Sequence, residues 1–186
     1  MMDSDERSDA ALIAAVLAGE ERAFTALMRR HKGDLYRFVR AYTGDSGEAF
    51  DLVQESFVAA WRVLSRYDAR WPFSIWLKRI ALNKCRDWRR RRAVRNFFYR
   101  AEDIDRPGLE IEQPIAAAND REDDLARLDQ AIATLPDGLK TPLLLSLTGE
   151  TSYREIGAAL GLTAKAVEVR IYRARRALAA ALGTDD

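Results

Sequence analysis

The chain has 186 residues, a net charge of +1 and a single cysteine, Cys85. This length allows one domain or two small ones, and a lone cysteine excludes a disulfide within the chain and fits a reducing compartment. The N-terminus has no signal-peptide core, and no apolar run approaches the roughly 18 residues of a membrane span, so we expect a cytoplasmic protein without direct membrane insertion.

Charge is distributed unevenly along the chain, although its sum is close to zero. Residues 84–100 contain eight basic residues against one acid, whereas residues 102–124 contain nine acids against two arginines. A basic segment of this kind suits contact with nucleic-acid phosphates. The distribution therefore indicates a nucleic-acid partner that the net charge conceals.

Apolar residues recur at helical spacing through most of the chain, and alternating β-branched runs are absent. This pattern predicts an all-α protein without a sheet. Met28 and Trp61 are among the predicted core residues. The predicted helices cover residues 9–18, 21–42, 48–65, 73 to beyond 90, 123–134, 139–147 and a final pair within 153–178.

The periodicity stops between residues 93 and 119, where Pro107, Gly108 and Pro114 punctuate an acidic stretch. Such a composition is typical of a linker. We predict two small helical domains joined by a flexible acidic linker, and the sequence does not decide how the domains sit relative to each other. The predicted bounds are 9–95 for the first domain, 96–119 for the linker and 120–182 for the second domain.

The stretch SYREIGAALGLTAKAVEVRIYRARRAL, residues 152–178, has the pattern of a helix-turn-helix. Ser152 and Glu155 have capping-box spacing, Gly157 is small where two helices approach closely, and Gly161 permits a positive φ in the turn. Thr163 can cap the second helix. An ordinary helical hairpin with a solvated basic face is the alternative reading.

The second helix of this motif has one apolar stripe and one polar face. An α-helix fits the major groove, where arginine can read guanine, glutamate can accept from cytosine and a valine methyl can touch thymine. We predict that the polar face contacts DNA through Lys165, Glu168, Val169, Arg170, Tyr172, Arg173, Arg175 and Arg176.

Aromatic residues also lie beside cations between residues 67 and 92. Exposed rings can stack on unpaired bases while cations hold the backbone, a combination that suits melted nucleic acid. Trp76 and Trp88 have core spacing. The candidates for base or phosphate contact are Tyr67, Trp71, Phe73, Arg79, Asn83, Arg86 and Arg90, and the alternative for the Arg89–Arg92 run is a solvated helix end.

Several of these segments resemble, in order and spacing, a bacterial RNA polymerase sigma factor of the extracytoplasmic-function type (ECF, group 4 of the sigma-70 family). The resemblance spans about residues 9–182. It rests on DLVQESFVAAW at 51–61, WPFSIWLKRIALN at 71–83, Leu135-Pro136, and YREIG at 153–157 followed by Arg173-Ala-Arg175.

The resemblance implies a function for each segment. The first domain corresponds to sigma region 2, in which Asp51, Gln54 and Glu55 dock on the β′ clamp helices of core RNA polymerase. Loop 67–73 and Asn83 hold a flipped base of the −10 element, with Arg79, Arg86 and Arg90 on nearby phosphates. The second domain corresponds to region 4, which contacts the β flap and reads the −35 element.

Within the −35 set, the resemblance assigns base reading to Glu168, Val169, Tyr172 and Arg173, and support on phosphate to the remaining cations. Trp71 stands where the family often has a smaller or basic residue, and Glu168 and Val169 stand where basic and small polar residues are common. We therefore expect the −10 loop to have its own preference, and we do not expect the commonest −35 sequence. Because the sequence shows no anti-sigma domain, we expect a separate anti-sigma factor.

Other classes of protein fit the sequence less well. His31 is the only histidine and Cys85 the only cysteine, so we expect no metal, no cofactor and no catalysis, with His31 simply exposed. A conventional two-domain regulator would bind a duplex operator alone, but it has no need of an Arg-rich helix beside an aromatic loop. A mimic that sequesters a regulator would usually carry a signal-receiving domain.

Overall fold

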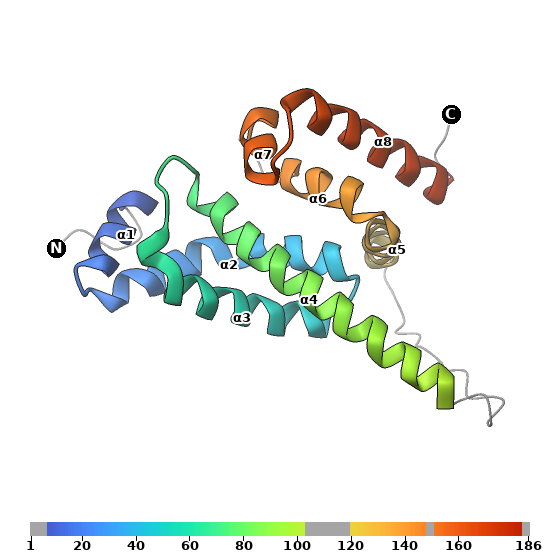
Figure 1. The fold of residues 1–186 in the computed structure, drawn as a ribbon, viewed down its shortest axis with the longest axis horizontal. Coiled ribbons are helices and arrows are strands. Elements are labelled where there is room, and N and C mark those ends of the chain that lie inside the picture. The colour runs from blue at the N-terminus through green and yellow to red at the C-terminus, as the bar shows by residue number, and fades with distance from the viewer. Residues whose placement is uncertain (1–6, 103–119, 148–150, 184–186) are drawn as a thin grey trace.

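The computed structural model describes residues 7–102, 120–147 and 151–183. These residues form helices and turns without a strand, which confirms the all-α prediction (Figure 1). The elements are α1 (Asp9–Leu17), α2 (Glu21–Thr43), α3 (Ser46–Val63), the short 3-10 helix η1 (Leu64–Arg66), α4 (Phe73–Glu102), α5 (Asp120–Thr134), α6 (Asp137–Ser146), α7 (Tyr153–Leu160) and α8 (Ala164–Leu182).

Local capping chemistry sets several of these boundaries. The Ser8 hydroxyl accepts from the Ala11 amide at 3.2 Å and begins α1. The Asp45 carboxylate accepts from the Gly47 and Glu48 amides at 3.0 and 3.1 Å and begins α3. Side chains that bind free amides at a helix start stabilise the first turn by about 1 kcal/mol.

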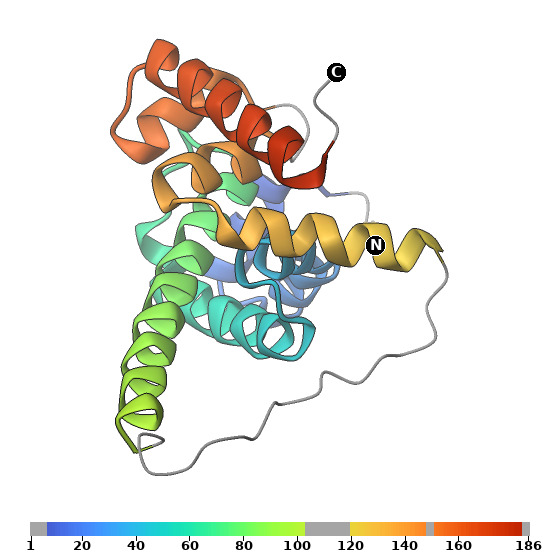
Figure 2. The ribbon, with the colours of Figure 1, turned by 90° about the vertical axis from the view of Figure 1, so that its right-hand side faces the viewer.

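Helix α4 extends further than the sequence pattern indicated. The pattern ended the helical periodicity at about residue 93 and the first domain at residue 95, whereas α4 continues to Glu102. Residues 91–96 are all exposed, and Figures 1 and 2 show this end of α4 projecting beyond the other helices. A projecting helix needs no apolar stripe, so periodicity could not reveal its end. Residues 103–119 lie outside the described residues, and the flexible linker stays a prediction.

Helix α2 lies at the centre of the N-terminal bundle, which consists of α1–α4 and η1. It packs against α1, α3 and α4. Two core assignments were wrong, since Met28 is 36% exposed and Trp61 is 41% exposed. The Trp61 ring meets the edge of Phe24, 4.9 Å between centroids, and its remaining surface faces outward.

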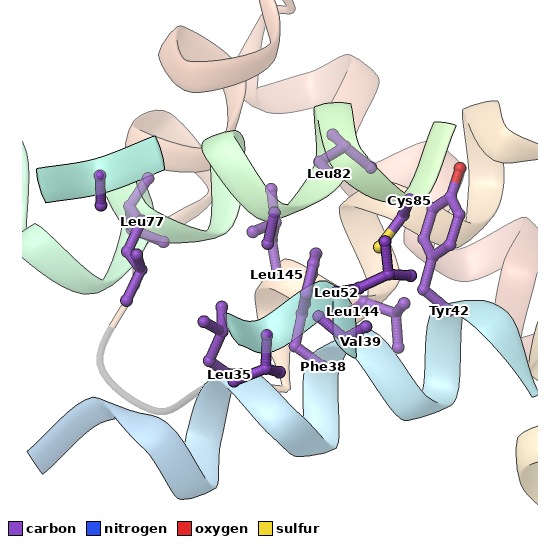
Figure 3. Packing of buried hydrophobic residues seen from close by; sticks show 14 of the residues in the cluster. Leu35, Phe38, Val39, Tyr42, Leu52, Leu77, Leu82, Cys85, Leu144 and Leu145 are labelled. Atoms are coloured by element: carbon purple, nitrogen blue, oxygen red, sulfur yellow. The ribbon is translucent and has the colours of Figure 1, made fainter. Parts of the chain in front are cut away.

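The C-terminal bundle consists of α5–α8, with α8 packed against α5, α6 and α7. It does not stand apart from the N-terminal bundle, because α5 and α6 pack on α2 and α6 and α7 pack on α4. Leu144 and Leu145 of α6 belong to the same buried cluster as Val39 of α2 and Cys85 of α4, which Figure 3 shows from close by, so one continuous core joins the bundles. No helix within the described ranges is long and apolar enough to cross a membrane.

Candidate nucleic-acid and polymerase interfaces

The predicted helix-turn-helix is formed by α7, a short turn and α8. The capping box is present, with Ser152 Oγ accepting from the Glu155 amide at 3.3 Å and Glu155 accepting from the Ser152 amide at 2.8 Å. Gly161 has a φ of 69°, as the turn requires, and the Thr163 hydroxyl caps α8. These contacts fix the angle at which α8 leaves the turn.

The predicted DNA-contacting side chains lie on the outer face of α8. All of them are exposed except Arg170, which is half-buried. Lys165 pairs with Glu168 at 2.9 Å, whereas no carboxylate within the described ranges pairs with Arg173, Arg175 or Arg176. This face, here called the α8 reading face, comprises Lys165, Glu168, Val169, Arg170, Tyr172, Arg173, Arg175 and Arg176.

A shallow hollow of about 380 Å³ lies on this face. Tyr153, at the start of α7, lines it together with Val169 and Tyr172 and is 39% exposed. In the sequence, Tyr153 marked only the expected start of a helix. Its position as an exposed aromatic at the first residue of the motif could have marked it as a surface contact.

The loop of residues 67–72 has a defined internal structure. The Tyr67 hydroxyl donates to the Trp71 carbonyl at 2.5 Å, and Asp68 accepts from the Arg70 amide at 3.0 Å. The Tyr67 ring packs on Trp76 at 5.4 Å and is half-buried, and burial raises the pKa of its hydroxyl. Trp71, also half-buried, lines a hollow of about 690 Å³ with Pro72 and Arg30.

Phe73 cannot serve in base contact in this structure, contrary to the sequence prediction. It is 2% exposed and its ring contacts those of His31, Tyr67 and Trp76 at 5.1, 5.9 and 5.6 Å. As the first residue of α4, Phe73 points into the bundle and packs against the Tyr67 ring of the loop. Tyr67 and Trp71 are the rings of the loop that stay partly exposed, and both line the hollow.

His31 is not simply exposed, so that expectation was also wrong. Its side chain is 13% exposed, and Nε2 lies 2.8 Å from Asp9 Oδ2. Arg30 binds the other oxygen of Asp9 at 2.6 Å. Burial raises the pKa of Asp9, but the hydrogen bonds from His31 and Arg30 outweigh burial and lower it. The histidine thus joins α2 to α1 through Asp9 and packs on Phe73 at the start of α4.

The polar stripe of α4 follows that loop directly. Arg79, Asn83 and Arg90 are exposed and Arg86 is half-buried, so four of the predicted −10 residues share one helix face. Trp88 is 7% exposed, which confirms its core assignment. Arg89, from the run that could have been a solvated helix end, instead contacts Asp137 of α6.

The predicted polymerase-docking residues lie together on the outer face of α3. Asp51, Gln54 and Glu55 are all exposed and line a hollow of about 490 Å³. Lys84 of α4 pairs with Glu55 at 3.3 Å. Val58, 51% exposed, adds an apolar contact that the sequence analysis did not single out.

The part of the chain that the structure describes contains no cluster of His, Cys, Asp and Glu able to hold a metal ion. Its notable surfaces are instead a basic helix-turn-helix, an aromatic loop beside a polar helix stripe, and an acidic helix face. Together they are the features of an all-α nucleic-acid-binding protein.

Comparison with known proteins identifies the family. Residues 27–95 match Sigma-70 region 2, and residues 125–178 match Sigma-70, region 4. The chain is 38% identical to the RNA polymerase sigma factor CnrH of Cupriavidus metallidurans, over 97% of each chain. It is 31% identical to the ECF RNA polymerase sigma factor SigW of Bacillus subtilis, covering 89% of this chain and 92% of SigW.

A solved structure agrees with these matches. The structure of CnrH in complex with the cytosolic domain of CnrY covers 99% of this chain and 100% of CnrH, with a TM-score of 0.69 and 34% identity. The chain belongs to the sigma-70 family of RNA polymerase sigma factors, in the extracytoplasmic-function group.

Proposed function

We propose that this chain binds core RNA polymerase and directs initiation at promoters that it recognises through separate −10 and −35 contacts. The observation that carries the proposal is the order of the three surfaces along one chain. An acidic face on α3 is followed by an aromatic loop with a polar stripe on α4, and then by the α8 reading face. A conventional regulator has no use for the first two.

The −10 element is the partner of loop 67–72 and the α4 stripe. Trp71 supplies an accessible ring, Asn83 supplies an amide that can both donate to and accept from a base edge, and Arg79 and Arg90 supply charge for phosphates. Extruding a base from a duplex costs a few kcal/mol, which such contacts must offset. Phe73 acts in this scheme only as support for the loop.

The −35 element is the partner of the α8 reading face. Arg173 has no carboxylate partner within the described ranges and is exposed, so its guanidinium is free to read a guanine. Glu168 is held by Lys165 in the free protein and must exchange that ion pair for a base contact. Because one contact replaces another, Glu168 adds little to the affinity for DNA and acts mainly on which base is preferred.

The α3 face is the partner of the β′ clamp helices, and the C-terminal bundle is the partner of the β flap. A separate anti-sigma factor is a further partner, and the complex of CnrH with CnrY supports this expectation. The protein acts in the cytoplasm, where the polymerase is, and performs no chemistry of its own. Domain bounds of 9–95, 96–119 and 120–182 remain part of the proposal.

Run-off transcription with core polymerase on sheared genomic DNA tests the function directly. Discrete new transcripts that appear only with this chain are expected, and alignment of their start sites gives both promoter elements. Specific binding of duplex DNA by the chain alone, without new transcripts, would instead establish the conventional regulator.

Three variants separate the surfaces. Asn83→Ala should impair open-complex formation and leave core binding intact. Gln54→Ala with Glu55→Ala should weaken core binding in competition with another sigma factor. Arg173→Ala should cost about 1–3 kcal/mol in discrimination at one −35 position, with Arg22→Ala, an exposed arginine of α2, as the matched control.

A further inference from the structure

The hollow of about 380 Å³ on the α8 reading face has an apolar wall within a cationic surface. Val169 is 37% exposed and Tyr172 is 62% exposed, and Tyr153 of α7 adds a third accessible side chain with an apolar body. A single exposed apolar residue is ordinary on a protein surface. Three that line one hollow from two helices form a small surface suited to an apolar group.

The backbone of the motif holds this wall in place. The capping box starts α7 at Tyr153, and α7 packs against α8 (Figure 1). On α8, Val169 and Tyr172 are three residues apart and are therefore neighbours on one helix face. Ile171, which comes between them in the chain, is 1% exposed and belongs to the core. The hollow is thus built into the free protein by two rigid helices.

The chemistry of Val169 restricts what the hollow can recognise. Valine has no atom that donates or accepts a hydrogen bond, so it can favour a base only through apolar contact. In the major groove, the apolar group on a base edge is the C5-methyl of thymine. 5-Methylcytosine carries the same methyl at the same ring position, whereas cytosine and uracil lack it. An apolar hollow on a helix that enters this groove therefore matches one chemical group.

The charges around the hollow suit DNA as its ligand. Arg173, Arg175 and Arg176 are exposed, and no carboxylate within the described ranges pairs with them, so they can neutralise phosphates beside the groove. The carboxylate that lines the hollow is Glu168, which Lys165 holds at 2.9 Å. A carboxylate can accept from the cytosine N4 amino group and is repelled by the thymine O4 oxygen.

We propose that the hollow binds the C5-methyl group of a pyrimidine in the −35 element, with Val169 and the rings of Tyr153 and Tyr172 as its wall. The proposal rests on the proposed −35 role of the α8 reading face and names the group that this face recognises. The methyl comes from thymine or from 5-methylcytosine. With 5-methylcytosine as its source, recognition of the promoter depends on cytosine methylation, and Glu168 can bind the amino group of the same base.

Exchanges that change only a methyl group test the proposal. The holoenzyme of core polymerase and the full chain is bound to a promoter defined by run-off start sites, in competition with the unmodified promoter. Each thymine of the −35 element, on either strand, is replaced singly by uracil, and each cytosine by 5-methylcytosine. At one position we expect uracil to weaken binding, or 5-methylcytosine to strengthen it, about fourfold, the factor for one buried methyl group.

Variants place the methyl in the hollow. Val169→Ser removes both valine methyls at little change in helix propensity, and it should reduce the methyl preference to below about twofold. Tyr153→Ala should also reduce the preference, whereas Tyr153→Phe keeps the ring and should retain it. Leu17→Ala, at an exposed leucine of α1, is the control and should retain the full preference. A ratio of two affinities does not respond to a general loss of stability.

Two results would overturn the proposal. One is equal binding of every modified and unmodified duplex by the natural chain. The other is a methyl preference that Val169→Ser leaves at its full value, which would put the methyl elsewhere on the α8 reading face. The uracil and 5-methylcytosine series tell the two sources of the methyl apart.

Transcription from the unmodified promoter keeps the two proposals distinct. Absence of transcripts refutes the sigma function, whereas transcripts combined with equal binding of all duplexes refute only the methyl contact.

Discussion

Gly157→Ala tests the geometry of the helix-turn-helix in a way that distinguishes tertiary contact from helix propensity. In an isolated helix, alanine is favoured over glycine by about 1 kcal/mol, so propensity alone predicts a more stable protein. In the folded chain, a Cβ at residue 157 would lie 2.6 Å from the Leu162 carbonyl oxygen and 3.3 Å from the Thr163 carbonyl carbon. Both are backbone atoms of the turn and cannot rotate away.

The contact should outweigh the propensity. Overpacking typically costs about 1–3 kcal/mol, and a backbone contact belongs at the upper end, which leaves a net loss of about 2 kcal/mol. For a chain of this size each kcal/mol lowers the melting temperature by about 2–4 °C, so we expect a fall of about 4–8 °C. The turn must also move, which displaces α8 and weakens −35 discrimination below the melting temperature.

Gly161 provides a matched comparison, since a Cβ there meets no atom within 4 Å but φ is 69°. Gly161→Asn should be tolerated, because asparagine adopts left-handed conformations more readily than other residues, whereas Gly157→Asn should fail as Gly157→Ala does. Thermal melts followed by circular dichroism measure both. A Gly157→Ala protein at least as stable as the natural chain would refute the close approach of α7 to the turn.

Three further predictions concern stability. Asp9→Asn should lower the free energy of unfolding at pH 6. The difference from the natural chain should shrink as pH falls below 3.8 and through the lower pKa of the folded state, because only the ionised Asp9 carboxylate is stabilised by folding. Urea titrations at pH 6 and pH 3 that give equal differences would contradict this. Burial raises the pKa of Cys85 from 9.0 to about 12, so the protonated thiol contributes fully to the stability of the fold below pH 9. Above pH 9 the free energy of unfolding should fall by about 1.4 kcal/mol per pH unit as this contribution is lost. Cys85→Ala should therefore show a shallower alkaline decline in urea titrations between pH 9 and pH 10.5, and parallel declines would rule the thiol out. Ser152→Ala removes the capping box of α7 and should cost about 1 kcal/mol, and an unchanged thermal midpoint would contradict the cap.

Features that depend on neighbours close in the chain were predictable from the sequence alone. The capping box at Ser152 and Glu155, the positive φ at Gly161 and the Thr163 cap are each settled within a few residues. The exposed face of α8 followed from helical periodicity, since an apolar stripe on one side fixes the polar side. Family resemblance then supplied the order of the two regions.

Features that depend on distant neighbours were decided only by the tertiary structure. Phe73 and Trp71 are two residues apart in an aromatic loop segment, yet Phe73 meets His31 and is buried while Trp71 stays accessible. Likewise, nothing local marks Lys140 as buried, because the Tyr42 ring and carbonyl that cover its ammonium belong to the other bundle. Burial of a ring or a charge is a property of whatever packs against it, and composition and spacing do not specify that partner.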